Sequence, residues 1–268
     1  MKTTVEYKFI DGIDKNLLSL DIYHFEEINN IKPVVVYVHG GGLAIGDKTD
    51  KINNKVNLFS DLGYIFVSVN YQLSPEGISI NPERIIYPTH NNDFADAIKW
   101  IFENINKYGG NKEKIVLIGH SSGAYLVSII GTSELFLPKR NIELNRLKGI
   151  ISIDTSGYNI EEQCKTKNDI YLNSFGNNEK NWKEASPIYN LQNEKFYPPF
   201  FIAKRGNAER IELADVFIRK LKSVGVKVEE AIATKYEHEE INDVIGEKNE
   251  EIITKPILKF IKQCFSEN

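Results

Sequence analysis

The sequence predicts an α/β fold in which a mostly parallel central sheet carries helices on both faces. Short apolar runs alternate along the chain with longer segments whose apolar residues recur at helical spacing. The run at 34–38 is continuously apolar, as expected of a strand that is covered on both faces. A length of 268 residues suits one large domain with a full core, so we expect a single domain over 1–268.

The expected elements follow one another from the amino end. The first half is predicted to contain a hairpin of two antiparallel strands (5–10 and 17–23), a strand at 34–38, a helix over 51–62, a strand at 65–71 and a helix over 88–108. The second half is predicted to contain strands at 114–118, 147–153, 200–204 and 227–232, and helices over 124–132, 209–224 and 252–265. Asp11 and Gly12 are typical of the hairpin turn, and Gly109 and Gly110 end the helix over 88–108.

One segment, 158–199, fits no single element. It is rich in Asn, Lys and Glu, with scattered aromatic residues, and it is too long for an ordinary connection. We expect it to form short helices that act as a small cap or lid over a site.

Composition excludes several classes of partner. With 33 basic and 37 acidic side chains the net charge is -4, so no basic surface for nucleic acid or an anionic membrane is expected. No apolar run approaches the length of a membrane span. Cys164 and Cys264 are far apart and lack metal-ligand spacing, which disfavours a disulfide framework and a zinc site. We therefore expect a cytoplasmic protein with a small, uncharged ligand and no metal.

The strongest motif surrounds Ser121. Residues 119–123 read Gly-His-Ser-Ser-Gly, between a predicted buried strand and a predicted helix. This is the G-x-S-x-G pattern of a nucleophile elbow, a sharp corner that exposes a serine hydroxyl at the carboxyl edge of a sheet. Gly119 and Gly123 are needed because a side chain there would strike the strand or the helix beside it. The alternative is a serine that only caps the following helix.

A second motif follows the strand at 34–38. His39 precedes three glycines, Gly40, Gly41 and Gly42, which leave bare backbone at the carboxyl end of a buried strand. Backbone N–H groups placed there are able to stabilise an oxyanion. Taken alone, the glycines are also consistent with a tight turn that binds nothing.

Together these motifs resemble the α/β-hydrolase superfamily, and most closely its carboxylesterase and lipase group with an HGGG loop, in the hormone-sensitive-lipase-like or small-carboxylesterase branch. The likeness runs from about Val34 to the last helix, and Leu43, Gln72 and Asn111 depart from the usual residues. The residues that carry it are His39-Gly40-Gly41-Gly42, Gly46-Asp47-Lys48, Asn70-Tyr71-Gln72-Leu73-Ser74-Pro75-Glu76, Tyr87-Pro88, Asp93, Trp100, Tyr108-Gly109-Gly110, Gly119 to Gly123, Ser186-Pro187 and 238–242.

The resemblance implies roles for individual residues. Ser121 would be the nucleophile, and the chain order of this fold places the base after it. Four of the five histidines precede Ser121, which leaves His238. The N–H groups of Gly41, Gly42 and Ser122 would form the oxyanion hole, while His39 would shape the glycine loop.

Two carboxylates are candidates for the acid that orients His238. Glu209 fits the position after the penultimate strand that most of these hydrolases use, although a carboxylate in the first turn of a helix is already explained by the helix dipole. Asp154 directly follows the strand at 147–153, where a minority of lipases carry their acid. We favour Asp154 narrowly, and the choice stays open at this point.

The expected function is a serine hydrolase that cleaves carboxylic esters of small molecules through an acyl-enzyme on Ser121, with no metal or organic cofactor. One alternative is an amide or formamide hydrolase, because arylformamidases share the glycine loop and the elbow. Another is a hydrolase-like protein that binds a ligand without turnover. Such proteins usually lose the serine or the histidine, and this sequence keeps both.

Overall fold

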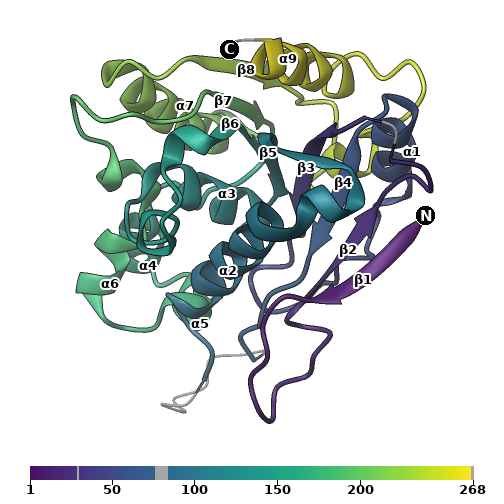
Figure 1. The fold of residues 1–268 in the computed structure, drawn as a ribbon. Coiled ribbons are helices and arrows are strands. Elements are labelled where there is room, and N and C mark those ends of the chain that lie inside the picture. Colours follow the sequence, from purple (N-terminus) through teal and green to yellow (C-terminus); the bar gives the residue numbers. More distant parts are fainter. Residues whose placement is uncertain (29, 76–83, 267–268) are drawn as a thin grey trace.

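The computed structural model describes residues 1–28, 30–75 and 84–266, and within them eight strands form one sheet (Figure 1). The strands are β1 Lys2–Glu6, β2 Ser19–Tyr23, β3 Lys32–Val38, β4 Ile65–Val69, β5 Gly110–His120, β6 Leu147–Ile153, β7 Phe200–Lys204 and β8 Val228–Ile232. Their order across the sheet is β1-β2-β4-β3-β5-β6-β7-β8. β1 and β2 are antiparallel to their neighbours, whereas the strands from β3 to β8 run parallel. The prediction of a mostly parallel sheet with an amino-terminal antiparallel hairpin is confirmed.

Helices cover both faces of this sheet (Figure 1). The α-helices are α1 Asn53–Asp61, α2 Thr89–Asn104, α3 Ser122–Thr132, α4 Ile160–Lys165, α5 Asp169–Phe175, α6 Glu179–Glu184, α7 Ala208–Ser223, α8 Glu240–Asp243 and α9 Thr254–Ser266. Short 3-10 helices occupy Ile105–Tyr108, Pro138–Arg140, Leu144–Arg146 and Pro187–Asn190. No α-helix in the described part of the chain is both long enough and apolar enough to span a bilayer.

The apolar run of strand β3 is explained by burial on both faces of the sheet. Val34, Val36 and Val38 pack in the core beneath α2, α3 and α7, whereas Val35 and Tyr37 pack in a second core beneath α1 and α9. All five side chains are buried. Since alternate residues of a strand point to opposite faces, a strand between two helical layers buries the side chains of both faces, which favours apolar residues.

The amino-terminal hairpin differs from the expectation in its register. β1 ends at Glu6, opposite Ser19, so the connection over 7–18 is longer than expected. The expected turn at Asp11 and Gly12 is present within it, where the N–H of Ile13 donates to the carbonyl of Ile10 at 3.2 Å. Contacts outside the hairpin hold this connection. The Tyr7 hydroxyl donates to the carbonyl of Asn70 at 2.9 Å, and Lys8 forms an ion pair with Asp93 at 2.9 Å. These partners are distant in sequence, which is why the local turn pattern did not predict the register.

Two other elements differ from the expectation. β5 begins at Gly110, before the expected start at 114, and its pairing with β3 shifts register between Lys32 and Val34. α8 was not predicted, because four residues are too few for a hydrophobic period. Within the motif at 70–76, Glu76 lies outside the described residues.

The segment 158–199 folds into α4, α5, α6 and the 3-10 helix Pro187–Asn190. An asparagine caps each of the three α-helices: Asn159, Asn168 and Asn178 accept hydrogen bonds from the backbone N–H groups of Glu162, Ile170 and Lys180. Asparagine at these positions satisfies N–H groups that the first turn leaves without partners. Three asparagines of the segment therefore mark helix starts.

The sheet brings three distant segments to one edge. In the pairing of neighbouring strands Val38 of β3 lies opposite Gly119, and His120 lies opposite Ile153 of β6. These strands are parallel, so their carboxyl ends meet. The glycine loop, Ser121 and Asp154 follow directly at that edge.

Candidate active site

Ser121 stands at a strained corner between β5 and α3. Its backbone has φ 56° and ψ −120°, in a region that residues with a side chain rarely adopt. A Cβ on Gly119 would lie 2.2 Å from the carbonyl oxygen of Gly123, and a Cβ on Gly123 would lie 2.2 Å from the carbonyl oxygen of Val38. Only glycine fits at either position, as the elbow motif predicts. The strain holds the hydroxyl at the carboxyl edge of the sheet.

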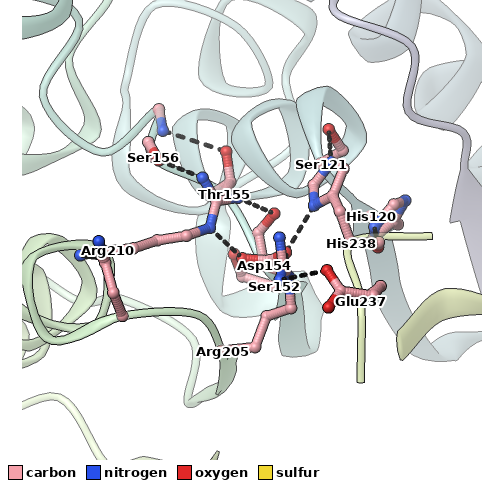
Figure 2. A network of polar contacts seen from close by, with 12 residues as sticks. His120, Ser121, Ser152, Asp154, Thr155, Ser156, Arg205, Arg210, Glu237 and His238 are labelled. Atoms are coloured by element: carbon pink, nitrogen blue, oxygen red, sulfur yellow. Dashed lines mark hydrogen bonds and ion pairs between the residues drawn. The ribbon is translucent and has the colours of Figure 1, made fainter. Parts of the chain in front are cut away.

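His238 contacts both Ser121 and Asp154 (Figure 2). Its Nε2 lies 2.9 Å from Oγ of Ser121, and its Nδ1 lies 2.5 Å from Oδ2 of Asp154. Because Asp154 is ionised and accepts only, Nδ1–H donates to it and Nε2 is left to accept the serine proton. The three side chains have the chain order and the contacts of a Ser-His-Asp triad.

The carboxylate of Asp154 is buried and fully engaged. Its side chain is 2% exposed, and it also accepts hydrogen bonds from Nε of Arg205 at 2.6 Å and from Nε of Arg210 at 2.8 Å. Burial by itself raises the pKa of this carboxyl, but hydrogen bonds from His238, Arg210 and Arg205 together hold the pKa well below its usual range. Asp154 is therefore ionised at neutral pH.

Glu209, the other candidate acid, lies elsewhere. It is exposed in the first turn of α7, and the structure gives no hydrogen bond between it and His238. Its negative charge near the amino end of α7 is favourable for the helix, which accounts for the residue without a catalytic role. Of the two carboxylates that the sequence left open, Asp154 is the one beside His238.

The glycine loop turns its backbone toward the same point. Gly41 and Gly42 both have positive φ, at 105° and 62°, and both line one cavity together with Ser121 and Ser122. Within the described residues, the N–H groups of Gly41, Gly42 and Ser122 have no hydrogen-bond acceptor. Leu43, the next residue, donates its N–H to Oγ of Ser122 at 3.2 Å. Three backbone donors are thus left for a ligand oxygen.

A family model described as BD-FAE matches residues 20–214 of this sequence. The chain belongs to the BD-FAE family. Esterase LipQ of Mycobacterium tuberculosis (strain ATCC 25618 / H37Rv) is 36% identical over 101 residues, which are 38% of this chain and 22% of LipQ. Phenmedipham hydrolase of Pseudarthrobacter oxydans is 30% identical over 119 residues, 44% of this chain and 23% of that protein. The match thus spans about a quarter of the length of these curated relatives.

Solved structures show the fold of this BD-FAE family member. Esterase B from Lactobacillus rhamnosis, inhibited by a tributyrin phosphonate, has a TM-score of 0.80 at 16% identity over 100% of this chain and 86% of that one. Thermogutta terrifontis esterase 2 phosphorylated by paraoxon has a TM-score of 0.70 at 17% identity, covering 98% and 91%. The fold is that of the α/β-hydrolases, as the sequence predicted.

In this BD-FAE family chain the side chain of His39 packs against the glycine loop and stabilises it. Its ring stacks on Tyr71, with centroids 4.6 Å apart, and its Nδ1–H donates to the carbonyl of Gly40 at 2.8 Å. A Cβ on Gly46 would lie 2.5 Å from Nδ1 of His39, so the loop closes tightly over the ring. Burial lowers the pKa of His39, which keeps the ring neutral.

Gln72, one of the departures from the resemblance, holds the loop after β4 in place through Asp93. Its backbone N–H and its side-chain amide both donate to Oδ2 of Asp93, at 3.2 Å and 2.8 Å. Lys8 supplies the positive charge, at 2.9 Å from Oδ1 of the same carboxylate. Asp93 therefore holds the loop through hydrogen bonds from Gln72 and an ion pair with Lys8.

His120 makes a contact with His238 that the sequence did not predict. His120 lies inside the elbow motif, and its Nε2–H donates to the backbone carbonyl of His238 at 2.7 Å. Burial, followed by the charge of His238, lowers the pKa of His120 to about 3. The neutral ring thus holds the loop of His238 against the end of β5. No local pattern could have predicted this contact, because it joins residues 118 positions apart.

A cavity of about 370 Å³ adjoins the triad. Ser121, His238 and the glycine loop form one side. Helices α4 and α5 supply the facing wall, with Gln163, Tyr171 and Phe175. The segment 158–199 thus contributes directly to the space in which a substrate would sit.

His120, Asp154 and His238 also lie close enough for their ligand atoms to surround one ion, within 4.8 Å of one another. Their donor chemistry does not favour a metal. His120 and His238 are engaged in hydrogen bonds, and two guanidinium groups already neutralise the carboxylate. The cluster therefore fits a proton-transfer site better than a cation site.

Proposed function

We propose that this chain is a serine hydrolase that cleaves carboxylic esters of small molecules through an acyl-enzyme on Ser121. One observation carries the proposal most directly: Oγ of Ser121, the imidazole of His238 and the carboxylate of Asp154 form one chain of hydrogen bonds of 2.9 Å and 2.5 Å. The hydroxyl is a weak nucleophile at neutral pH, and the adjacent base activates it.

In the proposed mechanism Oγ of Ser121 attacks the acyl carbonyl while its proton passes to Nε2 of His238. The negative charge that develops on the carbonyl oxygen is stabilised by the N–H groups of Gly41, Gly42 and Ser122. His238 then returns the proton to the leaving alcohol, and the C–O bond breaks to leave the acyl-enzyme. A water molecule, deprotonated by His238, repeats the attack and releases the acid.

In this mechanism Asp154 holds the ring of His238 in the required tautomer and stabilises the imidazolium that forms in each step. It remains ionised throughout, because the two arginines keep it so. We further propose that the single domain covers 1–268 and that 158–199 acts as a cap, since α4 and α5 line the cavity.

The relatives support the ester as the bond that is cleaved. LipQ is an esterase, and the compared structures include an esterase inhibited by a phosphonate and one phosphorylated by paraoxon. A formamide would fit the same triad. The hydrogen bonds that join Ser121, His238 and Asp154 also argue against a protein that only binds its ligand.

The cytoplasmic location stays a prediction.

Hydrolysis of p-nitrophenyl butyrate by the purified protein tests the proposal. We expect turnover that is lost in Ser121→Ala, together with covalent labelling by a fluorophosphonate in the wild type only. A parallel assay in which the ester competes with an aryl formamide separates the two bond types. Absence of ester turnover would contradict the proposal, and turnover of the formamide alone would favour the alternative bond type.

A further inference from the structure

Two arginines occupy the region in which the usual acid of these hydrolases was expected. Arg205 directly follows β7, and Arg210 lies in the first turn of α7 next to Glu209. Figure 2 shows both arginine side chains pointing toward Asp154 at the end of β6. The loop after β7 thus supplies cations to the carboxylate of Asp154 and no carboxylate to His238.

His238 and Arg205 share a single oxygen atom. Oδ2 of Asp154 accepts from Nδ1 of His238 at 2.5 Å and from Nε of Arg205 at 2.6 Å, while Oδ1 accepts from Nε of Arg210 at 2.8 Å. The side chain of Arg205 is 15% exposed and that of Asp154 is 2% exposed, so water screens these charges little. A full positive charge therefore lies beside the imidazole on the same acceptor.

Arg210 is further fixed by contacts of its own. Its Nη1 donates to Oγ of Ser156 at 3.0 Å, and its Nη2 donates to the backbone carbonyl of Asp154 at 3.4 Å. The guanidinium thus donates hydrogen bonds to the carboxylate of Asp154, to its backbone carbonyl and to Ser156. Asp154 has φ 47°, an unfavourable value for a residue with a side chain, and these contacts help to hold it there.

We propose that Arg205 and Arg210 are positioning residues that share the charge of Asp154 with His238 and thereby set the pH at which the imidazole becomes protonated. The inference rests on the proposed function, in which His238 must be neutral to accept the proton of Ser121. A carboxylate that two guanidinium groups already neutralise stabilises an imidazolium less than an unshared one does. The arginines therefore extend the active, neutral form of His238 to lower pH.

The bases packed near His238 from the other elements do not supply this effect. The ring of His120, at the end of β5, lies 4.7 Å from that of His238 between centroids, and its lowered pKa of about 3 keeps it neutral. Lys55 of α1 is buried beside α8, where it donates to the carbonyl of Asn242 at 2.7 Å. Burial lowers the pKa of Lys55 to about 7, and it makes no contact with the triad carboxylate.

The acidic groups on the loop of His238 are exposed and therefore weak. Glu237 lies 3.5 Å from Nη1 of Arg205 and is 85% exposed. Glu239 pairs with Lys51 at 3.6 Å and is 61% exposed. Water and salt screen such pairs, so they offset little of the positive charge that Arg205 brings to Asp154.

The variants Arg205→Gln and Arg210→Gln test the inference through the pH dependence of kcat/KM for p-nitrophenyl butyrate. Removing a neighbouring positive charge favours the imidazolium, so the acid limb of each profile should move up by about half to one pH unit. Arg205→Lys keeps the charge and should leave the limb near that of the wild type. Arg219→Gln, which removes an exposed charge paired with Glu212 on α7, is the matched control and should not move the limb.

A purely structural role would lower the plateau of the profile and leave the limb in place, and that result would overturn the inference. Should Arg205→Gln fail to fold, Arg210→Gln provides the same comparison.

A titration of the His238 ring by NMR in wild type and variants needs no turnover, with His238→Gln to assign the resonance. An upward shift in the variants supports the inference even if the wild type cleaves no ester, in which case the proposed function alone fails. An unchanged titration contradicts the inference.

Discussion

Asp154 accepts a hydrogen bond from Nδ1 of His238 at 2.5 Å, although 84 positions separate the two residues in the sequence. The contact joins the end of β6, an interior strand, to the loop that follows β8, the edge strand. It decides which carboxylate completes the proposed triad, and the predictions below begin from it.

Asp154→Asn should lower kcat by about 10² to 10⁴ because the amide cannot hold the required tautomer of His238. It should also lower the free energy of unfolding by about 3 kcal/mol, since Arg205 and Arg210 lose their counterion in a largely buried setting. Ester turnover and chemical unfolding measure the two effects. Glu209→Gln is the control and should stay within about twofold of wild-type activity. A large loss in Glu209→Gln with activity retained in Asp154→Asn would reverse the assignment.

His120→Phe should reduce kcat by about tenfold, because the loop of His238 loses the hydrogen bond that ties it to β5. The shape of the pH profile should not change, since burial lowers the pKa of His120 to about 3, so the ring stays neutral at and above pH 5. A pH series of kcat/KM from pH 5 to pH 9 checks both points. Loss of a titration step in this variant would show that His120 itself gains and loses a proton.

Gly119→Ala should destabilise the fold by about 3 kcal/mol, because the added methyl would lie 2.2 Å from the carbonyl oxygen of Gly123. Gly225→Ala is a useful control. Gly225 has φ 84° with open space around its Cβ position, so that variant should lose only about 1 kcal/mol of backbone preference. Urea unfolding of both variants gives the comparison. Equal losses would mean that the elbow tolerates a side chain.

The buried Lys55 should make the free energy of unfolding depend on pH. Burial lowers its pKa from 10.5 to about 7, so between these values the unfolded chain binds a proton that the folded chain does not. The free energy of unfolding therefore rises with pH in this window, by at most about 1.4 kcal/mol per pH unit from this group. Below pH 7 both states bind the proton, and the contribution is constant.

Lys55→Met removes this contribution. The wild type should gain stability relative to the variant between pH 7 and pH 10 and show no relative change between pH 5 and pH 7. Unfolding curves of both proteins across this range provide the measurement. A constant difference between them would mean that Lys55 keeps its ordinary proton affinity in the fold.

Much of the fold could be predicted because the signals are local. The continuous apolar run that became β3 results from burial on both faces, and the predicted bounds of β6 and β7 agree with the structure. Gly109 has φ 80° at the end of the helical segment that began with α2, as the C-cap pattern predicts. The elbow could also be predicted, because its glycines are required by contacts within a few residues and with the neighbouring strand.

The remaining features depend on contacts between distant residues. The hairpin register depends on Tyr7 reaching Asn70, which no turn pattern contains. The choice between Asp154 and Glu209 stayed open because it depends on where the loop after β8 returns to the sheet. For the same reason the positions of Arg205 and Arg210 at the carboxylate could not be predicted.

The most direct test of the proposed triad is the site and rate of fluorophosphonate labelling, followed by intact mass and peptide mapping. The wild type should form one adduct, on Ser121, at a rate that falls by about 10³ or more in His238→Gln, while Ser121→Ala forms none. An adduct on another residue, or equal rates with and without His238, would contradict the assignment of Ser121 and His238 as nucleophile and base.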